Sequence, residues 1–399
     1  MPPGTTAPMS LIPAIDERLR TTSLCLAVAS GSRDDPADRG GAAHLLEHLV
    51  MSVPMAGGAS FSERVERLGG RTNAETGLEQ TLYYAQVHAD DADEVAGLLL
   101  RAFTAPDFTA AALDDEREVV FQELAAAAAD PADVVQDAVL GALFPGHPLG
   151  RPVGGDPGQL RAVTLADVRA AHTALVSAPS TLVVVGPRLP RVLAGLPRGT
   201  RPAPKAPALP APEPGPGAVA AWPLDADYCW VCLGARSPEA GSALRPVYTV
   251  LAQLLGSSPS SLLYRALRGE RQLSYSFQAW DRGYREAGAW RVLVGTTPQQ
   301  ADEVVGTVRG LLAGLAADGP APEDLAAARR QAEVSLLLDT EEPLEHARLT
   351  ADRTAAGTRP WSLDAETAAL RSVTAGQIRT AAAHVAERLL VTVRPEGTR

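Results

Sequence analysis

The feature that most limits how this chain can fold is a proline-dense segment near its middle, residues 187–223. Its prolines include Pro202, Pro204, Pro207, Pro210, Pro212, Pro214 and Pro216. Proline locks φ and has no backbone N–H, so such a segment forms neither a helix nor a central strand. We therefore expect a semi-rigid linker over residues 188–222, with one domain at 1–187 and a second at 223–399.

The halves that flank this linker resemble each other. Both open with an apolar strand and close with a helix followed by another apolar strand. The four strands are expected at 23–29, 181–186, 228–234 and 389–393. Each closing helix begins with a threonine followed three residues later by an acid or amide, Thr164 with Asp167 and Thr374 with Gln377, which is the capping-box pattern. The repeat predicts an α+β fold of two tandem homologous domains.

Charge and hydropathy exclude several classes of protein. The formal net charge of −11 argues against a nucleic-acid binder, which needs a basic surface to replace counterions. No run approaches the roughly 20 apolar residues that span a bilayer. The first ten residues lack the basic stretch and apolar core of a secretory signal. We therefore expect a cytoplasmic protein with no membrane association.

The cysteines fit the same compartment. Three cysteines cannot form a disulfide framework, which is typical of a reducing environment. Cys229 and Cys232 have redox C-x-x-C spacing, but they fall in the strand expected at 228–234. Residues three apart on a strand point to opposite faces, so a redox pair is not expected there.

A candidate metal-binding motif lies in the first half. In Gly40-Gly-Ala-Ala-His-Leu-Leu-Glu-His-Leu-Val50, His44 and His48 are four residues apart among good helix formers. Such residues share one helix face, so both imidazoles can reach one ion. Glu47 is placed to accept a proton from a zinc-activated water, and H-x-x-E-H is a peptidase signature. Alone, the motif also fits an amphipathic helix with two solvated histidines.

A third ligand is available in a second predicted helix. Glu116 and Glu123 are seven residues apart, two helical turns, and share a face. Val119 and Val120 are expected on that same apolar stripe, which would bring both carboxylates inward with them. Buried carboxylates need a partner such as a metal or a ligand histidine. Catalytic zinc usually takes three protein ligands, and one of these two glutamates can supply the third. An ordinary charged surface helix is the alternative.

At this point the sequence resembles the pitrilysin-type metallopeptidases, in particular the short two-domain, bacterial processing-peptidase-like members. Residues 41–48 are similar to the G-x-A-H-x-L-E-H block of that family, and residues 69–84 to the segment that follows it. The resemblance implies two α/β-sandwich domains, one Zn²⁺ per chain, Glu123 as a ligand and Glu116 as a carboxylate that steadies a ligand histidine. It also implies substrate contacts at Asn73 and Ala74.

The second half resembles the same family. Arg268 and Tyr275 are seven residues apart, as in the family pair that stabilises the bound peptide and its oxyanion. In the large members this pair belongs to the other half of a four-domain chain. The resemblance therefore implies that a two-domain chain obtains the pair from a second subunit, as a homodimer or as a heterodimer with a related subunit.

Glu75 departs from the family, which often has an aromatic or small residue there. One hypothesis is that Glu75 favours a basic residue next to the scissile bond; a carboxylate that faces solvent is the alternative.

Taken together, the sequence predicts a zinc metalloendopeptidase that hydrolyses peptides or short unfolded polypeptides. The alternative is a catalytically silent or partner-dependent subunit of a heterodimeric peptidase, since fold alone does not give activity. A silent subunit usually loses a histidine, the base or the third ligand, and this chain retains all four.

Overall fold

The structure is a computed structural model that describes residues 9–56, 58–199, 227–256, 258–270, 272–356 and 361–395. The chain forms two compact units, which are described separately. The described parts of 1–124, 152–205 and 338–361 form the first unit, and those of 125–151, 206–337 and 362–399 form the second. Residues 200–226, which include most of the linker predicted at 188–222, lie outside the described residues, so the predicted domain limits stay a prediction.

The first unit is built on a five-stranded sheet in the order β1-β5-β2-β4-β3. Its strands are β1 (Met9–Ile15), β2 (Thr21–Val28), β3 (Arg71–Thr76), β4 (Thr81–His88) and β5 (Ser180–Gly186). β1 and β5 are parallel, and the other neighbours are antiparallel. β3 is the edge strand at one end of this order, so a further strand could pair with its outer edge.

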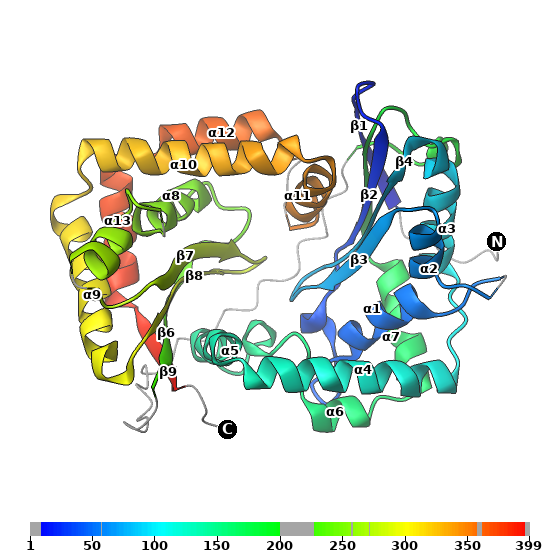
Figure 1. Cartoon of the computed structure of the whole chain (residues 1–399), viewed down its shortest axis with the longest axis horizontal. Helices are drawn as coiled ribbons and strands as arrows, with labels where there is room; N and C mark the ends of the chain where they lie inside the picture. Colours follow the sequence, from blue (N-terminus) through cyan, green and yellow to red (C-terminus); the bar gives the residue numbers. More distant parts are fainter. Residues whose placement is uncertain are drawn as a thin grey trace. The chain divides into compact units, whose positions relative to one another are not determined.

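Helices cover both faces of this sheet (Figure 1). They are α1 (Ala42–Ser52), α2 (Phe61–Arg67), α3 (Ala92–Thr104), α4 (Ala110–Ala129), α6 (Pro157–Arg161), α7 (Leu165–Ser177) and α11 (Pro343–Ala356). The main core joins one sheet face to α1, α2, α3 and α7, with Leu45, Leu49 and Leu99 almost fully buried in it. The opposite face is covered by α11, whose Ala347 and Ala351 are fully buried against β2 and β5.

The second unit repeats this plan around a four-stranded antiparallel sheet in the order β7-β8-β6-β9. The strands are β6 (Cys229–Ser237), β7 (Ser276–Gly283), β8 (Gly288–Thr296) and β9 (Leu390–Pro395). The helices are α5 (Pro131–Leu143), α8 (Arg245–Leu255), α9 (Ala301–Asp318), α10 (Pro322–Glu341), α12 (Leu363–Ser372) and α13 (Ala375–Glu387). α5 packs on β6 and β9 through Val135 and Val139.

Each sheet is therefore covered by one helix from the other half of the sequence. α11 follows the linker and packs on the first sheet, whereas α5 precedes the linker and packs on the second. The predicted α+β class and the tandem duplication are confirmed. Both expected capping boxes are present, at the starts of α7 and α13.

None of the three cysteines forms a disulfide, and all three are buried. Cys229 and Cys232 both lie on β6, and Cys232 packs against α5. Burial raises the pKa of the Cys232 thiol to about 12. A thiol with so high a pKa is a poor redox nucleophile, in agreement with the sequence analysis. No helix among the described residues is both long enough and apolar enough to cross a bilayer.

Candidate metal centre

The metal centre is built on α1, whose start is tightly fixed. Gly41 caps this helix with φ +92°, and a Cβ there would lie 2.5 Å from the carbonyl oxygen of Gly154. Only glycine tolerates both the positive φ and this close approach. The Asp35 carboxylate accepts hydrogen bonds from the backbone N–H groups of Gly41 and Ala43, both at 2.9 Å. These contacts fix the first turn of the helix that carries both histidines.

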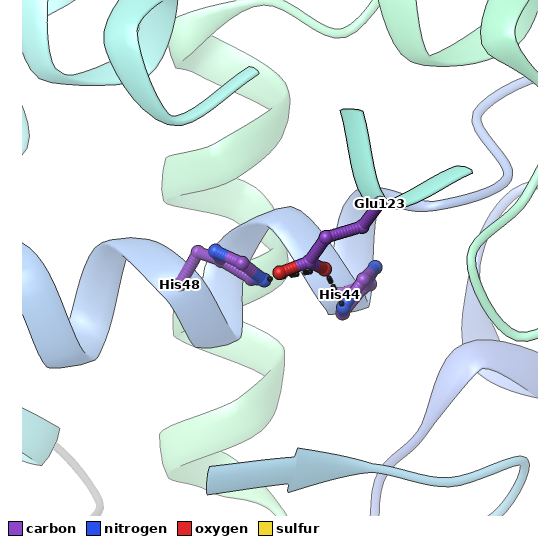
Figure 2. Close-up of side chains that lie close together, drawn as sticks. All are labelled: His44, His48 and Glu123. Atoms are coloured by element: carbon purple, nitrogen blue, oxygen red, sulfur yellow. Dashed lines mark ion pairs between the residues drawn. The ribbon is translucent and has the colours of Figure 1, made fainter. Parts of the chain in front are cut away.

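His44 and His48 face the same side of α1, with ring centroids 4.9 Å apart. Glu123 reaches them from α4, as Figure 2 shows. Its Oε2 lies 3.5 Å from His44 Nε2 and 3.3 Å from His48 Nε2. One ligand atom from each of the three residues lies within 4.8 Å of the other two. The group can therefore hold one metal ion.

The chemistry of this donor set fits zinc. Two imidazoles and one carboxylate are a common ligand set of catalytic zinc, and they leave a fourth position open. Burial, together with the neighbouring His48, lowers the pKa of His44. A lower pKa favours the neutral imidazole, which is the form that binds a metal.

Glu116 lies next to the second histidine. Its Oε2 is 3.3 Å from His48 Nδ1, and both side chains are less than one fifth exposed. A carboxylate on one ring nitrogen orients the imidazole and leaves the other nitrogen for the ion. His48 Nε2 is indeed the atom that faces Glu123.

One expectation about α4 is wrong. Val120 is fully buried as expected, but Val119 is 42% exposed. Successive helical residues are about 100° apart round the axis, and the buried stripe of α4, which contains Leu113 and Val120, is too narrow to include both valines. The two glutamates lie at the border of this stripe, so Glu123 is half exposed, with a side-chain exposure of 50%.

Glu47 lies beside the histidines and is only 8% exposed. Thr76, the last residue of β3, donates a hydrogen bond from Oγ1 to Glu47 Oε2 at 2.7 Å. Burial raises the pKa of the Glu47 carboxyl, and the hydrogen bond from Thr76 opposes this shift. The sequence alone indicates no role for Thr76, although this residue stands inside the block that resembles the family.

One cavity of about 570 Å³ connects these side chains. Its walls come from α1, α2, β3 and α4, and it includes both histidines, Glu47, Glu116 and Glu123. Asn73 and Ala74, the predicted substrate contacts, also line it. The first unit thus brings together every predicted site residue of the first half.

Glu75 has a partner within the chain. Its carboxylate pairs with Arg348 of α11 and accepts a hydrogen bond from the Tyr84 hydroxyl at 2.9 Å. Arg348 also pairs with Glu345 at 2.6 Å and stacks on the Tyr84 ring. The carboxylate is therefore paired with an arginine, but it is 46% exposed and lines the same cavity, so its effect on substrate preference stays a prediction.

Arg268 and Tyr275 belong to the second unit, whereas the metal centre belongs to the first. Arg268 lies in the π-helix Tyr264–Glu270, with its guanidinium carbon 5.2 Å from the centroid of the Tyr264 ring and 5.5 Å from that of Tyr275. Tyr275 is 70% exposed. The two predicted residues thus lie together, with the arginine close to two aromatic rings.

Comparison with known proteins places the chain. The family model described as insulinase (peptidase family M16) matches residues 14–157, and the model described as peptidase M16 inactive domain matches 162–332. An uncharacterized zinc protease of Mycobacterium tuberculosis is 31% identical over 364 residues, which cover 86% of this chain and 80% of the relative. The chain belongs to peptidase family M16. The resemblance found in the sequence is confirmed, and this M16 chain is a short member with two domains.

Two further similarities cover a smaller and a larger share of this M16 chain. A probable mitochondrial-processing peptidase subunit beta of Schizosaccharomyces pombe is 31% identical over 150 residues, 37% of this chain and 33% of that one. The crystal structure of a protease from Helicobacter pylori superposes with a TM-score of 0.81 at 18% identity and covers 96% of both chains. At that identity the superposition supports the fold alone.

Proposed function

We propose that this M16 chain is a zinc-dependent endopeptidase that hydrolyses peptides or short unfolded polypeptides. The observation that carries the proposal is the convergence of His44, His48 and Glu123 around one point, next to the buried carboxylate of Glu47. A bare metal-storage site has no need of such a carboxylate. A peptidase needs it as a general base.

The residues divide the chemistry between them. His44, His48 and Glu123 would hold the zinc ion, which would supply a water molecule of lowered pKa and a Lewis acid for the peptide carbonyl. Glu47 accepts the proton of the attacking water and can pass it to the leaving amine nitrogen. Glu116 holds the His48 ring in the orientation that presents Nε2. In this proposal each chain binds one zinc ion.

The substrate would bind along β3. This strand is last in the order of its sheet, so a peptide in extended conformation can add to its outer edge. Asn73 and Ala74 lie on β3 and line the cavity that contains the histidines. Backbone hydrogen bonds would then supply much of the affinity, which makes the sequence preference loose.

Arg268 and Tyr275 would stabilise the negative charge of the tetrahedral intermediate. A guanidinium and a phenol hydroxyl are hydrogen-bond donors, and such donors stabilise an oxyanion as its charge develops. We assign them to the site of a partner subunit, which makes the working enzyme a homodimer or a heterodimer with a related chain. The three cysteines form no disulfide, which supports a reducing location such as the cytoplasm.

The test is cleavage of a mixed peptide library by the purified chain and by Glu47→Gln, with zinc content measured on both. We expect the wild type to cleave and the zinc-loaded variant to be inactive. Equal cleavage by both would remove Glu47 from the mechanism. A wild type that binds no zinc after reconstitution would overturn the proposed function.

The same assay distinguishes an active peptidase from a catalytically silent subunit. Zinc in both proteins with no cleavage by either, alone or with a related chain added, would favour that alternative. Cleavage only after the related chain is added would favour a heterodimer.

A further inference from the structure

Thr76 contacts the catalytic carboxylate from the strand that would receive the substrate. Its hydroxyl donates to Glu47 Oε2 at 2.7 Å. Within the described part of the chain, the Thr76 hydroxyl makes the one side-chain hydrogen bond found for the Glu47 carboxylate. We propose that Thr76 is a positioning residue that holds Glu47 in the orientation required of a general base. This inference rests on the proposed function.

The hairpin that carries Thr76 is closed by several hydrogen bonds. Thr76 pairs with Thr81 across the β3–β4 turn, and the Gly77 N–H donates to the Gln80 carbonyl at 2.8 Å. The Thr81 hydroxyl donates to the Ser30 carbonyl at 3.0 Å. Backbone hydrogen bonds thus fix the end of β3 within the hairpin, whereas the Thr81 side chain is bound to the loop after β2 and not to Glu47.

The tip of the turn is fixed to the same loop. The Ser32 N–H donates to the Gly77 carbonyl at 3.0 Å, and the Arg33 N–H donates to the Leu78 carbonyl at 2.9 Å. Arg33 and Glu79 form an ion pair in which both side chains are less than 10% exposed. Gly31 packs so closely on the turn that a Cβ there would meet backbone atoms at under 3 Å. The Thr76 hydroxyl therefore has a defined position, which a positioning group needs.

Glu47 needs such a group because its side chain has three rotatable bonds and lies in a wide cavity. The fixed hydroxyl holds Oε2, which leaves Oε1 for the attacking water. A misplacement of about 1 Å can reduce the rate of a catalytic step by about a hundredfold.

The experiment compares Thr76→Val with Thr76→Ser and with a matched control. Valine keeps the shape of threonine and removes the hydroxyl, whereas serine keeps the hydroxyl. Thr81→Val makes the same change at the cross-strand neighbour, whose hydroxyl bonds Ser30 rather than Glu47. The readouts are kcat and KM for one peptide from the library screen, and zinc content.

We expect Thr76→Val to lower kcat about tenfold to a hundredfold, with KM within about twofold and zinc content unchanged. Thr76→Ser should restore kcat to within about threefold of the wild type, and Thr81→Val should leave it within about twofold. A normal kcat in Thr76→Val would overturn the inference and leave the proposed function intact. So would an equal loss of kcat in Thr76→Ser.

A measurement without turnover tests the contact itself. The change in thermal midpoint caused by Thr76→Val is measured in the wild type and in a Glu47→Ala background, on metal-free protein. We expect a smaller change when Glu47 is absent, because residues in contact are not additive. Equal changes in both backgrounds would overturn the inference. A different outcome is that Thr76→Val changes the thermal midpoint less in the Glu47→Ala background, but the zinc-loaded wild type cleaves no peptide. That outcome would overturn the proposed function and not the contact between Thr76 and Glu47.

Discussion

Replacing Glu116 by glutamine should weaken zinc binding without removing a ligand. Glu116 Oε2 lies 3.3 Å from His48 Nδ1, and the two side chains are 18% and 16% exposed. A partly buried hydrogen bond to a charged group contributes about 1.5 to 3 kcal/mol. If that contribution acts through the orientation and basicity of His48, its loss raises the zinc dissociation constant about tenfold to a hundredfold, the range found for such partners.

The assay is competition for zinc against a chromophoric chelator at fixed pH and ionic strength. The matched control is Glu118→Gln, which removes the same charge from the exposed face of the same helix. Through-space electrostatics would weaken binding in both variants to a similar small extent, because exposed charges are screened. Equal dissociation constants for Glu116→Gln and Glu118→Gln would refute the argument that Glu116 acts through His48.

Three further predictions concern stability. Val120→Ala should reduce the free energy of unfolding by about 2 to 3 kcal/mol in urea titrations, because Val120 is fully buried, whereas Val119→Ala should change it by less than about 0.5 kcal/mol. Gly41→Ala should lower the thermal midpoint and weaken zinc binding more than Gly58→Ala does. Both glycines have a positive φ, but only at Gly41 would a Cβ meet the Gly154 carbonyl. Equal effects of the two substitutions would contradict the close approach. The hydrogen bond from Arg371 holds the pKa of Glu333 down to about 2, so its stabilisation is complete above the unfolded value near 4.5 and is lost as the pH falls towards 2. The thermal midpoint should therefore fall more steeply over that pH range in the wild type than in Glu333→Gln, and parallel curves would contradict the pairing.

The sequence was sufficient for the parts of the site that depend on local geometry. His44 and His48 share a face because four residues make about one helical turn, whatever the rest of the chain does. The four expected strands, which are β2, β5, β6 and β9, and both capping boxes likewise follow from patterns a few residues long. Glu116 and Glu123 were found through their own two-turn spacing and through the family resemblance, and their geometry beside the histidines agrees with the predicted roles.

The expectation that Val119 and Val120 share one buried stripe of α4 is wrong because it uses periodicity alone. Periodicity gives the direction of a side chain round a helix, but not how wide a strip its neighbours cover. Val119 lies outside that strip and Val120 inside it. Only the packed partners of α4 decide this.

Contacts between distant segments were decided by the tertiary structure alone. The sequence shows Glu75 as a free acid near the substrate strand, and the fold gives it Arg348, 273 residues away, as a partner. Thr76 is one residue further along, so its side chain points to the other face of the sheet and reaches Glu47. Glu75 and Thr76 thus differ in their contacts because successive side chains of a strand point to opposite faces of the sheet. The local sequence does not specify what lies on each face.

The sequence by itself determined the duplication, the helix that carries the H-x-x-E-H motif and the residue types needed for zinc chemistry. It did not determine that α5 and α11 would each cover the sheet of the other half. The physical reason is that burial of apolar surface is non-directional, so an apolar helix face carries no information about which sheet it will cover. That choice is made only when the whole chain packs.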